Sequence, residues 1–508
     1  MTTTAPLRFL SRITIELDGP ASIRTGDESD QSDMPFVVDA SGLPAIPGSS
    51  LAGMLRARFE ALKGPEQTEY IFGASKGSSD PEGSRIAISW AHVHDESDQP
   101  IDGRLSPETK SEFLVAVATG ELRDRVAIDH RGTARDKGKF DQEVLYRGTR
   151  FTFEIELHLD EGEEDLANQV ITDLVELLHG PSTRQGGSKH SGFGAFRVIR
   201  AQGKLFDLRD GEDFRHYGQL SSDLRKHWDL DSLRWEAREP DDLATITINL
   251  QPETFFFVGG GESIEGSEED KSGAKIAPVR TQRISWRGGR GQLEKDPILY
   301  LPGSSIKGAL AHRVAFHANR LTGHFAGLGI NAEDFCGERN AVIRALFGFS
   351  LEDRPREKGI QPLSDDHRFF DPAEDDTSEE RGKMGQVLID DVLLEGHQTQ
   401  TLIHISTDPF TGGVRHGFLF TEEAIQPSSK EITILVHVEK PETLDQTAKK
   451  ALYLAIEDLR LGRLALGSGE GRGNGRFRGE EVRWPESLRF DTSEEVSTST
   501  AIATQEAS

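Results

Sequence analysis

The pattern of hydrophobic and polar residues contains the same succession of strand-like and helix-like segments twice along the chain. Near residue 13, and again near residue 246, aliphatic residues alternate with polar ones, which is the period of a half-buried strand. In each half a stretch with helical spacing follows, then a second alternating stretch, then a second helical one. The positions are Ile13, Ile15, Leu17, Leu51, Leu55, Phe59, Phe151, Phe153, Ile155, Leu157, Leu166, Val170, Leu174 and Leu178, and later Ile246, Ile248, Leu250, Ile306, Leu310, Val314, Ile432, Ile434, Val436, Val438, Leu444, Ala448, Leu452 and Leu459.

Short motifs occur at matching places in these two halves. The sequence Pro-Gly-Ser-Ser precedes each first helical stretch, at residues 47–50 and 302–305, and a Phe-Gly pair follows it, at 72–73 and 347–348. Glycine-rich segments at 186–194 and 467–475 stand before the last strand of each half. The chain is therefore predicted to contain two copies of one elaborated βαββαβ unit, which is an α+β fold. The serines are expected to cap the helices that they precede.

The repeat divides the chain into domains. We place the first domain at residues 1–205 and the second at 244–486, joined by a connector at 206–243. Trp228 and Trp235 among the connector's charges predict a partly helical segment that packs on a domain. Residues 487–508, rich in Ser, Thr and Glu, are expected to form a disordered tail. The repeat does not explain residues 351–381 in the second domain.

Composition favours a cytoplasmic protein, and the charge argues against a nucleic-acid partner. The chain has no apolar run of membrane-spanning length, and its first residues do not resemble a secretory signal. The single cysteine, Cys336, excludes a disulfide framework and is expected to be a buried small residue. The net charge of −27 would repel phosphates. However, acidic residues are concentrated in a few runs, so a local basic groove on an acidic body is compatible with the composition.

The paired Pro-Gly-Ser-Ser motifs and glycine-rich segments together resemble the RAMP superfamily, and within it the backbone subunits of type III CRISPR effector complexes, here as a double copy. This resemblance covers nearly the whole chain and implies two tandem ferredoxin-like, RRM-like domains. It also implies a guide (CRISPR) RNA, a complementary target RNA and other CRISPR effector subunits as partners, with no membrane. In such complexes some backbone subunits cleave the target RNA.

Several polar residues of these motifs are candidates for RNA binding. Glycine allows a backbone to approach a phosphate, and a helix N-terminus offers free N–H groups, so nearby serines and cations would add donors and charge. In the second copy Ala311 stands where the first has Arg56, so equal RNA contacts in the two domains are not expected. Each of these side chains has an ordinary alternative as a cap or a solvated charge. The candidates are Ser49, Ser50, Arg56, Arg58, Lys189, His190, Ser304, Ser305, Lys307, Arg313, Arg472 and Arg476.

A further segment resembles the extended hairpin that this family inserts into the guide and target duplex. It comprises residues 127–134, including Arg131 as an RNA-binding candidate, and continues to Leu145. The second copy has residues 407–414 and then 418–421 at this place. Phe140, Phe418 and Phe420 would stack on bases, or alternatively belong to the core.

The resemblance also suggests a catalytic carboxylate. Asp33 stands in an Asp-x-Pro-aliphatic context upstream of the first Pro-Gly-Ser-Ser motif, where cleaving members of the family carry an aspartate. Such a residue can hold a divalent metal, with Mg²⁺ as the expected ion, or orient a 2′-hydroxyl for attack on phosphorus. The second copy has Ile276 at the matching place. Either that domain does not cleave, or Asp270 serves instead.

Three functions are therefore compared. The first is a guide-dependent endoribonuclease subunit with a catalytic first domain. The second is an RNA-holding scaffold that lacks a working Asp33. The third is a guide-processing RNase of the same superfamily, with His190 or His130 as general acid or base. Two backbone-gripping copies favour the first two, and no phosphate-binding loop of the P-loop type occurs in the sequence.

Overall fold

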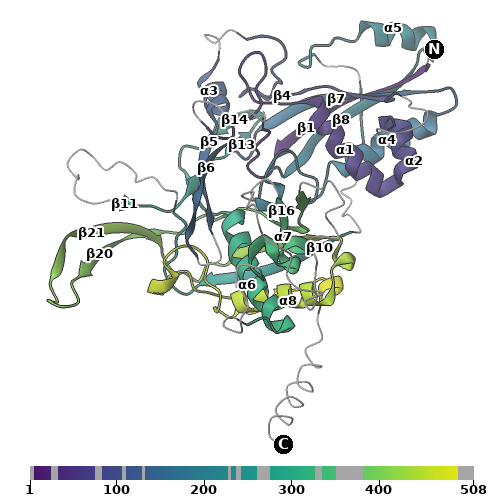
Figure 1. Cartoon of the computed structure of the whole chain (residues 1–508). Coiled ribbons are helices and arrows are strands. Elements are labelled where there is room, and N and C mark those ends of the chain that lie inside the picture. Colours follow the sequence, from purple (N-terminus) through teal and green to yellow (C-terminus); the bar gives the residue numbers. More distant parts are fainter. Residues whose placement is uncertain are drawn as a thin grey trace, which may run out of the picture.

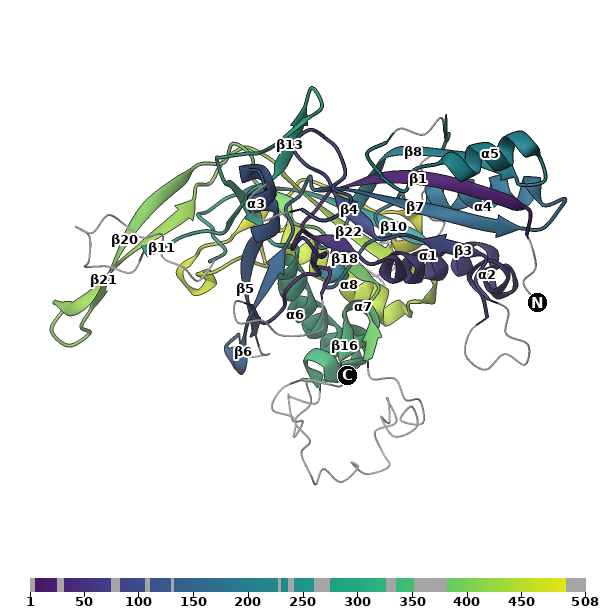
Figure 2. The same ribbon diagram turned by 90° about the horizontal axis from the view of Figure 1, so that it is seen from above.

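The fold is described from a computed structural model (Figure 1). It covers residues 5–24, 32–74, 83–105, 110–128, 132–226, 230–235, 242–259, 275–325, 335–350 and 382–489. Helices and strands alternate in two units, and long hairpins project from both (Figures 1 and 2). Among the described residues, no helix is long and apolar enough to cross a membrane.

The first repeat is built on an antiparallel sheet whose central strand is β1. This strand pairs with β7 on one side and β8 on the other, and β3 and β4 extend the sheet beyond β7. Helices α1 and α4 cover one face. The elements are β1 (Leu7–Leu17), β2 (Ala45–Ile46), α1 (Gly48–Lys63), α2 (Pro65–Phe72), β3 (Ile86–Ile88), β4 (Ala91–Val93), α3 (Glu112–Thr119), β5 (Glu121–Ile128), β6 (Ala134–Val144), β7 (Arg150–Leu159), α4 (Glu164–Leu177), the 3-10 helix η2 (Lys189–Ser191) and β8 (Phe196–Asp207).

The second repeat has the same arrangement. Strand β10 pairs with β22 on one side and with β23 and β24 on the other, and β18 extends the sheet beyond β22. Helices α6 and α8 pack together over it. The elements are β10 (Leu243–Pro252), β11 (Lys275–Ile276), β12 (Arg280–Thr281), β13 (Ile284–Arg287), β14 (Arg290–Leu293), β15 (Ile298–Leu301), α6 (Gly303–Thr322), α7 (Ala341–Phe347), β16 (Gly348–Ser350), β17 (Gly382–Met384), β18 (Val387–Ile389), β19 (Val392–Leu393), β20 (Thr399–Thr407), β21 (Val414–Ile425), β22 (Ile432–Glu439), α8 (Gln446–Arg460), the 3-10 helix η6 (Glu470–Arg472), β23 (Phe477–Arg478) and β24 (Val482–Arg483).

The Pro-Gly-Ser-Ser motifs start helices, but not by serine capping. Pro47 and Pro302 are the N-cap residues, and neither helix has a side-chain cap hydrogen bond. The glycine is the constrained position, because a Cβ on Gly48 or Gly303 would lie 2.2 Å from the carbonyl oxygen of Ile88 or Ile389. Glycine therefore lets each helix start directly against the end of a strand. The predicted capping role of the serines is wrong.

The two repeats are interlocked by exchanged hairpins. Ile284 of β13 is buried in the core of the first repeat, and Trp286 donates a hydrogen bond to the Gly148 carbonyl oxygen at 2.7 Å. In the other direction, the β5–β6 hairpin of the first repeat extends to the second (Figure 1), where Arg123 contacts Asp391. The hydrophobic pattern does not predict this exchange, because alternation along a hairpin strand does not indicate which repeat the strand packs against.

The connector contains α5 (Gly211–Gln219) and β9 (Asp231–Ser232), which pairs with β8. Trp235 packs on the first core and stacks on His179 with 5.8 Å between ring centroids, as the predicted partly helical, packed connector requires. Cys336 is only half-buried, so its expected full burial is wrong. Trp228, residues 351–381 and the tail from residue 490 lie outside the described residues.

Candidate nucleic-acid interface

The glycine-rich segment of the first repeat forms a tight loop that contacts the second repeat. Gly194 has a φ angle of 81°, and a Cβ on it would lie 2.1 Å from the Gln185 carbonyl oxygen. Glycine is needed for this return of the backbone onto itself. At the tip, a Cβ on Gly192 would lie 2.8 Å from Oδ1 of Asp391 in the second repeat. The 3-10 helix η2 of the loop therefore packs against α6 and β18.

Two adjacent aspartates after β18 hold this junction together. Asp390 accepts a hydrogen bond from Arg184 of the loop, and Asp391 accepts one from Arg123 of β5, each at 2.5 Å. Burial raises the pKa of Asp390, but the hydrogen bond from His437 and the charge of Arg184 outweigh it and hold the pKa well below its usual range. Asp390 is therefore ionised at neutral pH and anchors the loop.

Asp391 also makes the two helix starts different. Its Oδ1 accepts a hydrogen bond from the backbone N–H of Gly303 at 2.8 Å, so a carboxylate of the chain occupies the N-terminal end of α6. The matching strand end of the first repeat carries Ser89 and Trp90, which supply no carboxylate. Of the predicted helix-start sites, Ser304 and Ser305 thus lie beside an anion of the protein, whereas Ser49 and Ser50 do not.

Four cations surround the junction without carboxylate partners. Burial lowers the pKa of Lys307 to about 8 and that of Arg125 to about 10, and the charge of Arg125 lowers that of Lys307 further. The pKa values of Lys189 and Arg24 are also lowered by burial. Lys307 Nζ donates to the Phe347 carbonyl oxygen at 3.3 Å. Within the part of the chain that the structure describes, none of the four forms a direct ion pair, while the more distant charges of Asp391 and Glu439 favour the charged forms of Arg125 and Lys189. The burial of these four charges is therefore incompletely compensated.

Five buried polar atoms without hydrogen-bond partners among the described residues lie in the glycine-rich loop, in the residues just before it and in the segment after β1 that contacts it. They are Ser22 Oγ, Ser182 Oγ, Arg184 Nη2, Gln185 Oε1 and His190 Nε2. Burial, together with the charge of Lys307, lowers the pKa of His190 to about 4, so the imidazole is neutral at physiological pH. Buried polar groups in native proteins are normally hydrogen-bonded, so these atoms are exceptions among the described residues.

The structure joins Asp33 to the same region. The Asp33 side chain is exposed, and its Oδ2 accepts a hydrogen bond from the backbone N–H of Asp141 at 3.1 Å. In return, Asp141 Oδ1 accepts one from the backbone N–H of Asp33 at 2.8 Å. The segment then pairs with Arg24, whose guanidinium donates to the Ser188 hydroxyl of the glycine-rich loop at 2.8 Å. These contacts place Asp33 and Asp141 next to each other, on the segment that leads into the pairing of Phe36 with Arg24.

Other predicted cations of the first repeat are engaged within the protein. Arg56 donates to the carbonyl oxygens of Phe72 and Gly73, at 3.2 and 2.9 Å, and so holds the end of α2. Arg58 lies at the junction, where it donates to Glu439 at 2.7 Å. Arg131 and His130 lie outside the described residues.

The predicted arginines of the second repeat are paired with acids. Arg313 donates to Asp458 at 2.6 Å, and Arg476 lies 2.9 Å from Glu253. Arg472 of the second glycine-rich segment donates to the fully buried Glu422 at 2.7 Å. Asp270 lies outside the described residues, while Ile276 is exposed at the end of β11.

The structure therefore brings together Lys189, His190 and Lys307 of the predicted set. Sequence reasoning misses Arg24, Arg125, Arg184 and Asp141. Arg184 stands two residues before the first glycine of the loop, which is a signal of the same kind as Lys189. The others are brought to the loop by tertiary contacts from distant segments.

Comparisons with known proteins agree with this division of the chain. The family model described as the RAMP superfamily matches twice, over residues 14–197 and 285–478. The chain is also similar to a protein of Methanocaldococcus jannaschii described as "CRISPR system Cms endoribonuclease Csm3". That similarity is 24% identity over 223 residues and covers 39% of this chain and 84% of the relative. Because the family model matches most of both repeats, this chain belongs to the RAMP superfamily and contains two RAMP domains.

Proposed function

We propose that this chain is a guide-RNA-binding backbone subunit of a type III CRISPR ribonucleoprotein, and that the guide backbone crosses the junction between the two repeats. The observation that carries this proposal is the group of largely buried cations at that junction that form no direct ion pair among the described residues: Arg24, Arg125, Lys189 and Lys307. A chain with a net charge of −27 has enough carboxylates to neutralise them, yet none is paired with them among the described residues. The phosphates of an RNA strand would supply the missing charge.

The electrostatics of this site suit a ligand with several phosphates. Each buried cation raises the free energy of the RNA-free chain, because it has lost water without gaining an anion at ion-pair distance among the described residues. A phosphate at hydrogen-bond distance would offset that cost and raise the pKa of Lys307 toward its ordinary value. The open Nη2 of Arg184 would donate to the same backbone. Binding of this kind is local and depends on salt despite the acidic remainder of the chain.

We further infer that each repeat is an elaborated ferredoxin-like domain. The first repeat runs β1, α1, β3 and β4, β7, α4, β8, with the sheet order β4-β7-β1-β8. The second runs β10, α6, β18, β22, α8, β23, with the sheet order β18-β22-β10-β23. Two antiparallel strands flank the first strand in each case, which supports the split βαβ pattern.

For cleavage, we propose that Asp33 is the catalytic residue of the first repeat and holds a divalent metal, Mg²⁺. Its exposed carboxylate and that of Asp141 keep one oxygen each outside the reciprocal hydrogen bonds that join them. Oxygen pairs of this kind suit Mg²⁺, which takes one or two protein carboxylates when phosphates supply other ligands. The metal would stabilise charge at the scissile phosphate. The name of the M. jannaschii relative supports an endoribonuclease, and Ile276 in the second repeat supports a single cleaving domain.

The two other functions are weighed by the same residues. A scaffold without cleavage would need the junction cations but not the exposed Asp33. A guide-processing RNase would need a histidine that accepts and donates a proton near neutral pH. Burial and Lys307 lower the pKa of His190 to about 4, so this imidazole would not act as a general acid there.

RNA retention tests the proposal. The chain is purified without nuclease treatment, and the RNA that it carries is extracted and quantified per mole of protein. Lys189→Glu with Lys307→Glu should remove most of this RNA, because the two charges are reversed inside the proposed groove. The matched control is Lys383→Glu with Arg483→Glu, which changes the net charge equally at two exposed positions on β17 and β24. Equal RNA content in both double variants would refute the junction as the RNA site.

A further inference from the structure

The contact between the two repeats joins unlike surfaces of two similar domains. The first repeat contributes residues 184–194 of the glycine-rich loop and the β5–β6 hairpin, which together form its loop side. The second repeat contributes the start of α6 and the aspartates after β18, which form its helix side. Each repeat has both sides, so the second also has a loop side, at residues 465–475 and β20–β21, and the first has a helix side, at the start of α1 and residues 89–90. A contact between unlike surfaces can be repeated from molecule to molecule.

These two remaining sides are open in the part of the chain that the structure describes. Trp90 on the helix side of the first repeat is 45% exposed, whereas the side chain of Asp391, at the matching place, is 7% exposed. In the first glycine-rich loop none of residues 186–194 is exposed, but in the second loop residues 467, 468 and 470–473 are. Figures 1 and 2 show the β20–β21 hairpin projecting away from both sheets. Both surfaces are therefore accessible to a partner.

The helix sides of the two repeats can be matched residue by residue. The residue pairs after β3 and β18 both follow the carbonyl oxygen that lies against the glycine of a Pro-Gly-Ser-Ser motif. Ser89 and Trp90 therefore match Asp390 and Asp391. The two carboxylates that hold the junction together are thus replaced by an uncharged polar residue and an aromatic one on the open helix side.

The loop sides have changed at the corresponding places. The register of the two glycine-rich loops matches Arg184 to Ala465. In each long hairpin the strand pairing, counted from the bridge that anchors its second strand, matches Arg123 to Leu402. The arginines that contact the two aspartates in the junction are thus replaced by apolar residues on the open loop side. Each cation and its carboxylate are lost together, as a contact without buried unpaired charges requires.

A third ion pair of the junction follows the same rule. Arg58 of α1 is paired with Glu439 of the second repeat at 2.7 Å. The matching Arg313 is paired with Asp458 of its own repeat at 2.6 Å. Counted from the partners of β3 and β18, the residue that matches Glu439 is His158. The arginine is therefore neutralised on the open loop side, and the opposite helix side has no carboxylate at this place.

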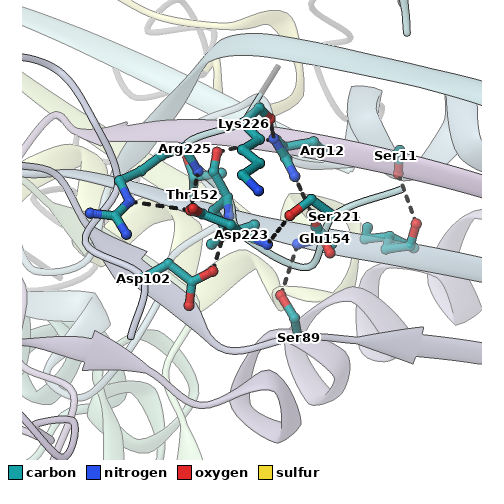
Figure 3. A network of polar contacts seen from close by, with 12 residues as sticks. Ser11, Arg12, Ser89, Asp102, Thr152, Glu154, Ser221, Asp223, Arg225 and Lys226 are labelled. Atoms are coloured by element: carbon teal, nitrogen blue, oxygen red, sulfur yellow. Dashed lines mark hydrogen bonds and ion pairs between the residues drawn. The ribbon is translucent and has the colours of Figure 1, made fainter. Parts of the chain in front are cut away.

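Trp90 is held at the strand end with its ring in solvent. Ser89 Oγ accepts a hydrogen bond from the backbone N–H of Glu154 at 2.9 Å, as Figure 3 shows, and donates one to the Trp90 carbonyl oxygen at 3.0 Å. Beside Asp391 the junction has the Tyr300 ring, which lies 4.5 Å from the Arg123 guanidinium. The first repeat has Ala45 at the matching place, so Trp90 supplies the aromatic ring of the open helix side.

From these matched changes we infer that the two open sides bind each other, so that a second copy of this chain docks its second glycine-rich loop and β20–β21 hairpin on the helix side of the first repeat. Leu402 packs on the Trp90 ring, in place of the ion pair between Arg123 and Asp391. Burial of an exposed tryptophan stabilises such a contact. A different protein as partner gives no reason for the two open sides of one chain to lose their charges at the same places. This inference does not rest on RNA binding at the junction.

Association can be measured on the RNA-free full chain by sedimentation velocity, at concentrations up to about 100 µM. We expect the average mass of the unmodified chain to rise with concentration. Trp90→Asp and Leu402→Arg should each weaken association by at least about tenfold, because each places a charge against an apolar residue. An equal mixture of the two variants should associate again, since the new aspartate and the new arginine then meet. The control is Met384→Asp, which adds the same charge at a 69% exposed residue of β17 and should associate normally.

The mixture separates loss of contact from loss of folding, because misfolded variants would not restore each other. A mass of one chain at every concentration overturns the inference, and so does unchanged association of both single variants. A mixture that stays as dissociated as its components also overturns it. RNA takes no part in the measurement, so its outcome is distinct from a failure of the proposed RNA path at the junction.

Discussion

Lys307 allows the electrostatic argument to be tested through stability alone. The ammonium is largely buried, and its pKa falls from 10.5 to about 8. At about 1.4 kcal/mol per pKa unit, keeping Lys307 charged costs the RNA-free chain about 3 kcal/mol near neutral pH. Lys307→Met keeps most of the side-chain volume and removes the charge. We expect the variant to be more stable than the unmodified chain at pH 7, by up to about 3 kcal/mol.

The pH dependence has a definite sign. Because the folded pKa lies below the unfolded one, the unfolded chain binds more protons between pH 8 and 10.5, and the stability of the unmodified chain rises with pH across that window. The methionine variant should lose this contribution. The assay is the midpoint of chemical unfolding of RNA-free protein at pH 7 and at pH 9.5, with Lys383→Met as an exposed-lysine control.

Bound RNA should reverse the effect of the Lys307 charge on stability. With RNA bound, the ammonium gains phosphate partners, so the unmodified chain should be stabilised by RNA more than the methionine variant is. A variant that is less stable at pH 7 and has an unchanged pH profile would refute the desolvation argument. In that case, Lys307 would contribute only its packing and its contact with Phe347.

Three further predictions concern the remaining parts of the site. Asp33→Ala should abolish one metal-dependent cut of the target RNA in the assembled complex without loss of bound RNA. Asp141→Ala should weaken the same cut. Persistence of every cut would place the nuclease in another subunit. Asp391→Asn keeps the shape but removes one of the two carboxylates that contact the buried Arg123, with Glu121 left as the other, so thermal unfolding should show a loss of stability of about 2 kcal/mol. Ile284→Ala should cost about 3 kcal/mol and lower the melting of the first repeat, although Ile284 belongs to the second; unchanged melting would contradict the interlocked cores.

The hydrophobic periods predicted the strands and helices of both repeats, because each apolar position in these elements has to be buried in the core. Ile13, Ile15, Leu51 and Leu55 are all buried, as alternation and helical spacing demand. The Pro-Gly-Ser-Ser motif correctly indicated two helix starts, but the capping role expected of its serines was wrong. Serine at a helix start usually indicates a cap, whereas here the strand end behind Gly48 makes the glycine the necessary residue.

Only those residues of the candidate site that stand within a single motif were predicted from the sequence. Lys189 and Lys307 were found because each stands in a glycine loop or at a helix start. Arg125 was not, because its place at the junction depends on how the β5–β6 hairpin crosses to the second repeat. Burial also changes what a residue can do. His190 reads as a titrating histidine in the sequence, whereas burial, and then the charge of Lys307, lowers its pKa to about 4 in the fold.

The two glycine-rich loops share a backbone conformation but differ in charge, which bears on where a strongly acidic chain would bind the proposed RNA. Gly186 and Gly194 correspond to Gly467 and Gly475. In each repeat these glycines lie against backbone carbonyl oxygens at equivalent positions. With this register, Glu470 stands where the first loop has Lys189. The first loop is therefore cationic and held between the repeats, whereas in the second loop Glu470 balances Arg472, whose guanidinium also donates to Glu422. Duplication preserved the backbone that glycine requires, and the charged side chains then diverged.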